Sequence, residues 1–264
     1  MTRLPPAWNI VKLTITIGVV TRKPDSEFPP FGVTADLVIL TVRDGRLCVA
    51  LVERRADPFK GRLALPGGFI SRHGLDQTLE DTALRELREE TGIQPDEVHL
   101  EQLKTYWTRG RDPRQEVVTV AWLALGPVHG DLQPGTDAAS ADWYTIDVAM
   151  ATPLAFDHDE ILQDGVERAR AKLEYTDVAA TFLPPQFTIA DVRGIYEAIW
   201  GFSLDPGNFQ RKVTGVFDRI ENAQVRSTGP GRPSALFTRK RRPSREGLDL
   251  TPIEPPFRRV DADD

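Results

Sequence analysis

The sequence predicts an α+β protein in which a mixed α/β domain is followed by a winged helix-turn-helix. Over the first 155 residues, apolar β-branched runs of strand length are interrupted by one amphipathic helical stretch, which favours a mixed sheet packed against helices. From about residue 181, two short helical stretches precede a hairpin tipped by glycine and proline. The net charge also changes there, from −8 over residues 1–180 to +6 over residues 181–245.

The chain divides by composition into five segments. The first is rich in proline and contains one alternating stretch, L-T-I-T-I at 13–17, which fits either an edge strand or a partly disordered region. We assign no function to this extension. The expected segments are an extension over 1–31, a mixed α/β domain over 32–155, a linker helix over 156–180, a winged helix-turn-helix over 181–242 and a flexible tail over 243–264.

The mixed domain begins with a predicted β-hairpin. Two apolar, β-branched runs, at 34–42 and 47–52, flank the dipeptide Asp44-Gly45. Asp-Gly between two such runs is typical of a two-residue hairpin turn. A charged loop and a short strand, L-A-L-P at 63–66, follow the hairpin.

An amphipathic helix is predicted next, over 75–90. Its apolar residues recur every four positions, so they share one face. Gly92 is the expected C-cap, because glycine adopts the left-handed conformation that often ends a helix. The remaining elements expected before the winged segment are strands at 98–105, 115–125 and 141–146 and a helix with an apolar stripe at 156–173.

The winged segment is predicted from its helix boundaries. Thr188 is the expected start of a helix that Gly201 ends. Asp205 can cap a second, shorter helix, and Pro206 suits its first turn. The stretches I-E-N-A-Q-V at 220–225 and A-L-F-T-R-K at 235–240 flank the turn S-T-G-P-G-R-P-S. Helix, short turn, basic helix and hairpin is the order of a winged helix-turn-helix.

Composition and cysteine content indicate a globular protein of a reducing compartment. The chain has 264 residues, of which 40% are hydrophobic and 27% charged. The single cysteine, Cys48, cannot form an internal disulfide, so we expect a cytoplasmic location. The apolar stretch at 10–20 contains Lys12 and is shorter than the roughly 20 residues that cross a membrane. It also lacks a cleavage site typical of signal peptides, and no membrane partner is expected.

The uneven charge suggests that the two parts of the chain have different partners. The whole chain carries a net charge of −6, but its segment 181–245 is basic. A basic segment behind an acidic domain can face nucleic acid. A solvated surface with chance clustering of charge is the alternative.

A glutamate-rich helix predicts a site for a divalent cation and a diphosphate. Residues 83–93 read A-L-R-E-L-R-E-E-T-G-I and follow L-P-G-G-F at 65–69. Glu86 and Glu90 are four residues apart, and Glu89 is three from Glu86, so these carboxylates are neighbours on the helix. Carboxylates beside a Gly-Gly turn suit a hard cation that holds a phosphate. A solvated helix face with Glu/Arg pairs is the alternative reading.

Residues 85–93, R-E-L-R-E-E-T-G-I, are similar to the second half of the Nudix signature, G-x5-E-x7-R-E-U-x-E-E-x-G-U, where U is a bulky aliphatic residue. The resemblance covers about 33–150 and implies an α/β/α sandwich with a mixed sheet. In the family's hydrolases, Mg²⁺ is held by the first and last glutamates of R-E-U-x-E-E and a carbonyl of the Gly-Gly turn. The resemblance therefore implies metal ligands at Gly67, Glu86 and Glu90.

The first half of the signature is altered. Seven residues separate Arg85 from Gln77, which stands where the family has glutamate, and five residues separate Gln77 from Ser71, which stands where the family has glycine. The pair Gly67-Gly68 lies further upstream, and the nearby acid Asp76 is not at the family spacing. Because Gln77 carries no charge and the longer loop can displace the turn, we expect metal binding to persist and hydrolysis to be residual or absent.

A second cluster, T-Y-W-T-R-G-R-D-P-R at 105–114, suggests contacts to the effector. Family members that handle ADP-ribose, and their regulator relatives, carry a similar R-D-P-R. Arg111 and Arg114 can reach phosphates, and Tyr106 or Trp107 can stack on adenine. A basic turn between strands is the alternative. The residues predicted to bind the effector are Gly67, Gly68, Tyr106, Arg111 and Arg114.

The stretch F-D-H-D-E-I-L at 156–162 also resembles those relatives. His158 could approach the ligand site. We expect instead that it orients or caps the start of the predicted helix.

The C-terminal segment resembles the Nudix-related transcriptional regulator (NrtR) family. The resemblance lies in L-P-P-Q-F-T-I-A-D-V-R-G-I-Y-E-A-I-W-G, N-F-Q-R-K and G-R-P-S-A-L-F, and the two resemblances together cover roughly 33–240. It implies a homodimer that binds double-stranded operator DNA, represses genes of NAD biosynthesis or salvage, and is released by ADP-ribose. Degenerate Nudix signatures are common in that family, which agrees with Gln77.

The short basic helix has side chains that suit base reading. Phe209 and Val213 are expected to pack inward and to leave the polar residues exposed. Asparagine and glutamine can read adenine, and arginine can read guanine, in the major groove. Two arginines of the hairpin, Arg232 and Arg239, are predicted to contact phosphates or the minor groove. The full set of predicted DNA contacts is Asn208, Gln210, Arg211, Lys212, Arg232 and Arg239. A winged helix used for dimerisation or protein contact is the alternative.

Taken together, the residues and the resemblances predict a homodimeric repressor that senses ADP-ribose, with Mg²⁺ possible at the Nudix glutamates. The alternative is a Mg²⁺-dependent ADP-ribose pyrophosphatase with an accessory C-terminal domain. The intact R-E-L-R-E-E favours that alternative, whereas Gln77 and the displaced Gly-Gly pair argue against it. Glu89 and Glu90 would be the catalytic candidates of such an enzyme.

Overall fold

The computed structural model describes residues 30–71, 74–127, 130–135, 138–225 and 234–240. The chain divides into two units, residues 1–30 and 31–264, and the elements below belong to the second. The strands are β1 (Gly32–Arg43), β2 (Arg46–Arg54), β3 (Leu63–Ala64), β4 (Gly67–Phe69), β5 (His99–Tyr106), β6 (Val117–Leu125), β7 (Ala138–Thr145), β8 (Asp218–Val225) and β9 (Ser234–Thr238). The helices are α1 (Leu79–Thr91), α2 (Ile146–Ala151), α3 (His158–Tyr175), α4 (Ile189–Trp200) and α5 (Pro206–Val213), with short 3₁₀ turns at Pro95–Glu97 and Val178–Phe182.

A seven-stranded mixed sheet forms the first domain. Its order is β3-β2-β1-β6-β5, with β4 also paired to β1 and β7 to β2. The central pair β1 and β6 is parallel, whereas the other pairs are antiparallel. The predicted hairpin is confirmed: β1 and β2 pair across Asp44 and Gly45, which both have positive φ, as a tight hairpin turn requires. The other predicted strands match β3, β5, β6 and β7 to within three residues at each end.

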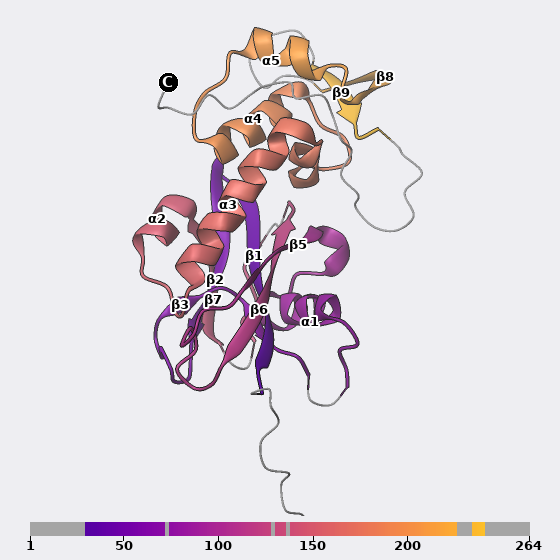
Figure 1. Cartoon of the computed structure of the whole chain (residues 1–264). Helices are drawn as coiled ribbons and strands as arrows, with labels where there is room; N and C mark the ends of the chain where they lie inside the picture. The colour runs from indigo at the N-terminus through magenta and orange to yellow at the C-terminus, as the bar shows by residue number, and fades with distance from the viewer. Residues whose placement is uncertain (1–29, 72–73, 128–129, 136–137, 226–233, 241–264) are drawn as a thin grey trace, which may run out of the picture. The chain divides into compact units, whose positions relative to one another are not determined.

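Helices cover both faces of this sheet. Along β1, Leu37 and Ile39 pack into one hydrophobic cluster with Leu87 of α1, whereas Val38 packs into a second cluster with Ile161 of α3. Successive strand residues point to opposite faces, so α1 and α3 lie on opposite sides, as Figure 1 shows. The arrangement is the predicted α/β/α sandwich.

Local capping determines where α1 begins and ends. Thr78 accepts a hydrogen bond from the amide of Asp81 at 3.0 Å, and the carboxylate of Asp81 accepts one from the amide of Thr78 at 2.8 Å. This capping box starts the helix at Leu79, so the predicted start at residue 75 was four residues too early. Gly92 ends the helix with φ of 77°, as expected.

The winged segment follows the predicted order. Thr188 caps α4, Gly201 ends it with φ of 83°, and Asp205 caps α5 ahead of Pro206. Strands β8 and β9 pair antiparallel, and Phe187 forms a further bridge to β9. The short helix α2 was not predicted. The stretch 13–17, the wing tip and the expected tail lie outside the described residues.

Helix α3 joins the sheet to the winged segment. Its apolar stripe packs on the sheet, and one hydrophobic cluster continues from there to α4 and α5. The hydroxyl of Tyr196 donates to the carbonyl of Leu173 at 3.0 Å, and the indole N–H of Trp200 donates to the carbonyl of Arg170 at 3.2 Å. Arg170 donates in return to the carbonyl of Ile199 at 3.1 Å. Within the described ranges, no helix is long and apolar enough to cross a membrane.

Candidate effector cavity and DNA-binding face

A cavity of about 530 Å³ lies where the β3–β4 segment, α1 and the start of α3 meet. Six residues that the sequence singled out line it: Gly67, Gly68, Glu86, Glu90, Arg111 and Arg114. Further lining residues include Asp36, Arg54, Phe69, Phe156 and His158. The fold thus brings residues from position 36 to position 158 to one concave site. Such a cavity with convergent polar groups is the usual form of a small-molecule site.

The Gly-Gly turn is held between the two glutamates of α1. The amide of Gly67 donates to Oε2 of Glu90 at 2.9 Å. At Gly68, a Cβ atom would lie 2.7 Å from Cδ of Glu86, so a side chain there would have to displace this buried carboxylate. The close approach of backbone and carboxylate explains why glycine is needed at this turn.

The glutamates differ in their surroundings. Glu86 is buried, and its Oε1 accepts a hydrogen bond from Arg85 at 2.6 Å; burial raises the pKa of this carboxyl. Glu89 lies on the exposed side of α1, paired with Arg85 at 3.1 Å, and does not line the cavity. Among the described residues, no group of three or more histidine, cysteine or acidic side chains could hold a metal ion. The metal ligands therefore stay a prediction, and Mg²⁺ would need oxygens of the ligand beside Glu86 and Glu90.

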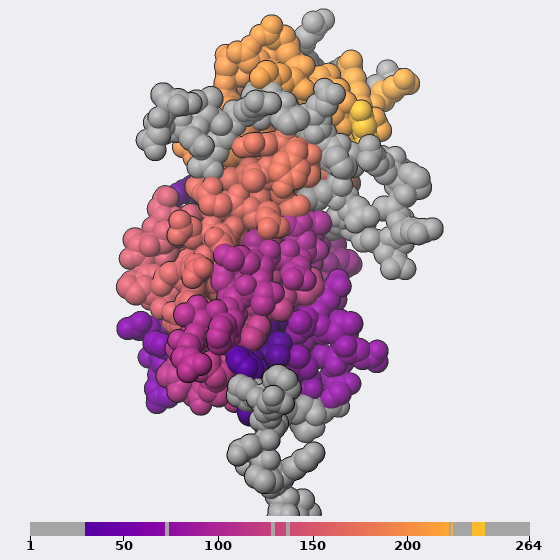
Figure 2. Space-filling model, viewed as in Figure 1, coloured from indigo at the N-terminus to yellow at the C-terminus, as the bar shows by residue number. Residues whose placement is uncertain are grey.

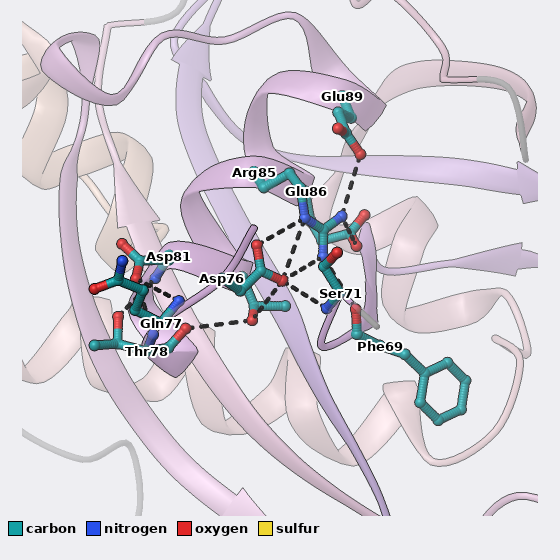
Figure 3. Close-up of polar contacts among 10 residues, drawn as sticks. Phe69, Ser71, Asp76, Gln77, Thr78, Asp81, Arg85, Glu86 and Glu89 are labelled. Carbon is teal, nitrogen blue, oxygen red and sulfur yellow. Dashed lines mark hydrogen bonds and ion pairs between the residues drawn. The ribbon is translucent and has the colours of Figure 1, made fainter. Parts of the chain in front are cut away.

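Arg85 is the centre of a polar network that the altered signature did not reveal (Figure 3). Its guanidinium binds the carboxylate of Asp76 at 2.9 to 3.3 Å, that of Glu86 at 2.6 Å and the carbonyl of Phe69 at 3.0 Å. Asp76 comes from the lengthened loop, one residue before Gln77, and its side chain is almost fully buried. The longer loop therefore supplies a carboxylate that ties α1 to the turn. An acid adjacent to the altered position was the only sequence signal for it.

Asp76→Asn is expected to lower the free energy of unfolding by about 1–3 kcal/mol at pH 7, since it removes a charged hydrogen-bond partner of Arg85. Arg85 lowers the pKa of Asp76 from 3.8 to about 2. The stabilisation from this carboxylate is therefore complete above pH 3.8, and it is lost as the pH falls through about 2. Urea unfolding at several pH values should show the difference from wild type shrinking below pH 4. Asp142→Asn, at an exposed position of β7, serves as the control.

Four arginines line the cavity, and three of them, Arg54, Arg111 and Arg114, differ in their partners. Arg111 is buried, and both oxygens of Asp157 accept its hydrogen bonds, at 2.6 and 2.7 Å. Arg114 forms a similar two-bond pair with Asp112. Among the described residues, Arg54 has no carboxylate partner, and it donates only to backbone carbonyls. Burial lowers the pKa of Arg54, and the positive charge of Arg114 adds to that effect.

Phe156 lies between two of these guanidinium groups. The guanidinium of Arg54 stands 4.7 Å from its ring centroid and that of Arg114 stands 5.8 Å away. Phe156 has a φ of 57°, the left-handed conformation that a non-glycine residue rarely adopts. Such strain persists where the surroundings hold it, often at binding sites. The cavity therefore has a basic wall, formed by Arg54 and Arg114 on either side of Phe156, and an acidic wall, formed by Glu86 and Glu90 of α1.

His158 both orients the start of α3 and lines the cavity. Its Nδ1 accepts the amide hydrogen of Leu65 at 2.8 Å, and its Nε2 lies 3.8 Å from Oδ2 of Asp36. Burial lowers the pKa of this imidazole, which is therefore neutral at pH 7 with its proton on Nε2. The expected role in orienting the helix is borne out by the bond to Leu65, and the cavity position adds to it.

The structure places two predicted adenine contacts away from the cavity. Tyr106 is buried in the core, where its hydroxyl donates to Asp164 at 2.8 Å, because its position on β5 points to the face that α3 covers. Trp107 is half-exposed and packs edge-on against Phe31 at 6.0 Å, and it is absent from the cavity lining. Tyr106 is thus corrected from an effector contact to a link between β5 and α3.

Helix α5 presents the predicted polar side chains to the surface. Phe209 and Val213 are buried, whereas the four candidate DNA contacts on this helix are exposed: Asn208, Gln210, Arg211 and Lys212. The space-filling view in Figure 2 shows the orange atoms of this part of the chain at the surface. The helix spacing accounts for the split, since residues four apart share a face.

Arg239, predicted as a DNA contact, is paired with an aspartate in the structure, and the DNA contact stays a prediction. Its guanidinium binds both oxygens of Asp177, at 3.0 and 3.1 Å, and is largely buried. The pair joins the wing strand β9 to the segment after α3. Arg232 lies outside the described residues.

Two family models match the chain in tandem. A model of the NUDIX domain matches residues 30–165, and a model of the NrtR DNA-binding winged helix domain matches residues 179–238. A protein of Acinetobacter baylyi, named as an ADPR responsive transcriptional repressor NtrR, is 34% identical over 214 residues, which cover 80% of this chain and 83% of that protein. The chain belongs to the Nudix-related transcriptional regulators. Its fold and its two predicted domain types are those of this NrtR family.

Solved structures agree with this assignment to the NrtR family. NrtR of Shewanella oneidensis, complexed with a 27mer DNA, is 32% identical and has a TM-score of 0.68, covering 79% of this chain and 93% of that chain. The NUDIX domain of the same protein, complexed with ADP ribose, is 36% identical with a TM-score of 0.50, covering 54% and 90%. An ADP-ribose pyrophosphatase of Methanocaldococcus jannaschii is 38% identical over 116 residues, 44% of this chain and 64% of that protein.

Proposed function

We propose that this chain is a transcriptional repressor that binds operator DNA through α5 and leaves it when ADP-ribose occupies the cavity. The observation that carries the proposal is the resemblance, over both domains, to a regulator solved with DNA, whose Nudix domain was also solved with ADP ribose. The exposed polar face of α5 supports the DNA-binding half. Genes of NAD biosynthesis or salvage are the proposed targets, and a homodimer would suit a palindromic operator.

The charges of the cavity support a diphosphate ligand. Arg54 and Arg114 offer guanidinium groups on one wall, and an anion between them would relieve their mutual repulsion. Glu86 and Glu90 on α1 would share a Mg²⁺ ion with the same diphosphate, since this ion commonly binds through one or two carboxylates and ligand phosphates. Arg111 and Arg114 are each paired with an aspartate, so a diphosphate would have to compete with Asp157 and Asp112 for them.

The test is an anisotropy titration of the full-length chain against the DNA upstream of its own gene and its neighbours. We expect sequence-specific binding that weakens at least about tenfold at saturating ADP-ribose, a typical size for coupling between two sites. Ribose 5-phosphate at the same concentration is the control. Operator affinity that is identical with and without ADP-ribose would refute the effector assignment, and no specific binding would refute the repressor assignment.

Arg54→Gln is expected to raise the Kd for ADP-ribose about tenfold, the effect of losing one charged hydrogen-bond donor to phosphate. Isothermal titration calorimetry measures the change. Adenosine, which has no phosphate, should bind equally to wild type and variant. Arg62→Gln is the matched control, because Arg62 also stacks on an aromatic ring, that of Phe59, but is exposed and outside the cavity lining. An unchanged Kd for ADP-ribose in Arg54→Gln would contradict the phosphate role.

A second candidate function is ADP-ribose pyrophosphatase activity. The intact R-E-L-R-E-E and the pairing of Asp76 with Arg85 favour it, as does the similarity to the archaeal pyrophosphatase. We expect slow release of AMP from ADP-ribose with Mg²⁺, lost at least about 100-fold in Glu90→Gln, a variant that lacks the carboxylate charge. Glu80→Gln, in the first turn of α1, is the control. Activity that survives in Glu90→Gln would place the chemistry elsewhere.

A further inference from the structure

Asp157 occupies the N-cap position of α3 but does not cap the helix. Among the described residues, its side chain makes no capping hydrogen bond, and both carboxylate oxygens bind Arg111 instead. At the starts of α1, α4 and α5, by contrast, Thr78, Thr188 and Asp205 each accept the amide hydrogen three residues on. Aspartate is among the preferred N-cap residues, so Asp157 has two competing partners available.

Arg111 is the group for which a ligand would compete. It lines the cavity with its side chain only 4% exposed, and it lies between Asp157 and Asp36, 3.5 Å from the latter. Two carboxyl groups therefore face one guanidinium, with the neutral imidazole of His158 beside them. An anionic ligand entering the cavity would add a third acceptor for Arg111. Asp157 uses the Nε and Nη2 donors of Arg111, so a ligand oxygen that approaches this edge of the guanidinium would compete with Asp157 for the same two hydrogens.

The other end of α3 is bonded to the DNA-binding segment. Arg170 and Leu173 exchange hydrogen bonds with α4, and Asp177, just beyond the helix, holds Arg239, the residue that follows β9. From Asp157 to Leu173 the helix spans about 24 Å at 1.5 Å per residue. Helix α3 therefore connects the cavity to α4, which precedes α5, and to the residue that follows the wing strand.

We infer that Asp157 is the switch that couples the cavity to the DNA-binding segment. Without ligand, Asp157 holds Arg111 and leaves the first turn of α3 without a side-chain cap. With a diphosphate in the cavity, Arg111 turns to the ligand, and Asp157 rotates to accept the amide hydrogen of Asp159, because the amide of Glu160 already donates to the carbonyl of Asp157 at 3.1 Å. The start of α3 then takes a second arrangement, which shifts α4 and β9 against the operator. This inference rests on the proposed function, since it assumes that ligand and operator oppose each other.

The decisive variant is Asp157→Asn in the full chain. Asparagine can cap α3 but cannot form the ion pair with Arg111, so it favours the ligand-bound arrangement. We expect ADP-ribose to bind about fivefold more tightly, operator DNA to bind about fivefold more weakly without ligand, and ADP-ribose to change operator affinity less than about twofold. Asp159→Asn is the matched control: it removes the same charge from the same helical turn, and Asp159 contacts only the amide of Leu154 among the described residues. That control should keep all three wild-type values.

A second measurement does not depend on the variant folding. In wild type, hydrogen exchange of the Asp159 amide should slow when ADP-ribose binds, because the new cap protects it. Asp157→Ser, which keeps a cap and lacks the charge, should reproduce the asparagine result. Wild-type coupling in both variants, or unchanged exchange at saturating ADP-ribose, would overturn the switch. Failure of wild type to bind ADP-ribose at all would instead refute the proposed function.

Discussion

Phe209→Ala is expected to lower the free energy of unfolding by about 3–5 kcal/mol, the usual loss when a buried phenylalanine is truncated. Phe209 is 1% exposed and packs edge-on against Tyr196 of α4, with ring centroids 5.2 Å apart. It is the main apolar anchor of α5, together with Val213. Removing it leaves a cavity and frees the helix that carries the candidate base contacts. Urea unfolding followed by circular dichroism measures the loss, and operator affinity should fall in parallel.

The matched control for this variant is Phe202→Ala. Phe202 lies in the turn between α4 and α5 and stacks on Trp200, but it is 45% exposed. The same change of side chain should therefore cost about 1 kcal/mol or less. If Phe209→Ala were no more destabilising than Phe202→Ala, α5 would not be packed on α4 as described.

Arg211→Ala is expected to weaken binding to the operator by about 1–3 kcal/mol, or roughly 5- to 150-fold. Arg211 is exposed on α5, where its guanidinium is next to Asn208 and can form two parallel bonds with a guanine edge. Fluorescence anisotropy with operator and with scrambled DNA of the same length measures the effect. The loss of affinity should be much smaller on scrambled DNA, because there Arg211 would have no guanine edge to bind and would contribute only its positive charge near the phosphates.

Two further variants sharpen this test. Arg211→Lys keeps the charge but loses the two-bond geometry. Its affinity for the operator should therefore be close to that of Arg211→Ala, and its affinity for scrambled DNA close to that of wild type. Arg88→Ala removes one charge from the exposed face of α1, away from the winged segment, and should change operator affinity less than about twofold. Equal affinity of Arg211→Ala and wild type for the operator would remove Arg211 from the base-reading set.

The elements that the sequence predicted well are those with a local signal. The hairpin at Asp44-Gly45, the end of α1 at Gly92 and the start of α5 at Asp205 each follow from a few neighbouring residues. The split of α5 into a buried pair and an exposed polar face follows from helical periodicity. The error at the start of α1 was also local: apolar spacing continued before Thr78, but the capping box decided the boundary.

The roles of charged side chains could not be predicted in the same way. Arg111 and Arg239 were both predicted to contact phosphate. In the structure, Arg111 is held by Asp157, 46 residues later in the chain, and Arg239 is held by Asp177, 62 residues earlier. Arg54 looked like part of a charged loop, yet it faces Arg114 across Phe156. An isolated basic residue in a sequence carries no information about which distant carboxylate, if any, the fold brings to it.

The sequence by itself determined the two domain types, the helix face with Glu86 and Glu90, and the exposed polar face of α5. These rest on hydrophobic periodicity, capping residues and a short spacing of carboxylates, all of which act within one or two helical turns. Only the tertiary structure decided which arginines remain available to an anion, that Asp76 completes the network of Arg85, and that Asp157 binds Arg111 rather than its own helix. Those outcomes depend on burial and on contacts between distant strands and helices, because a charge is neutralised by whatever the fold packs beside it.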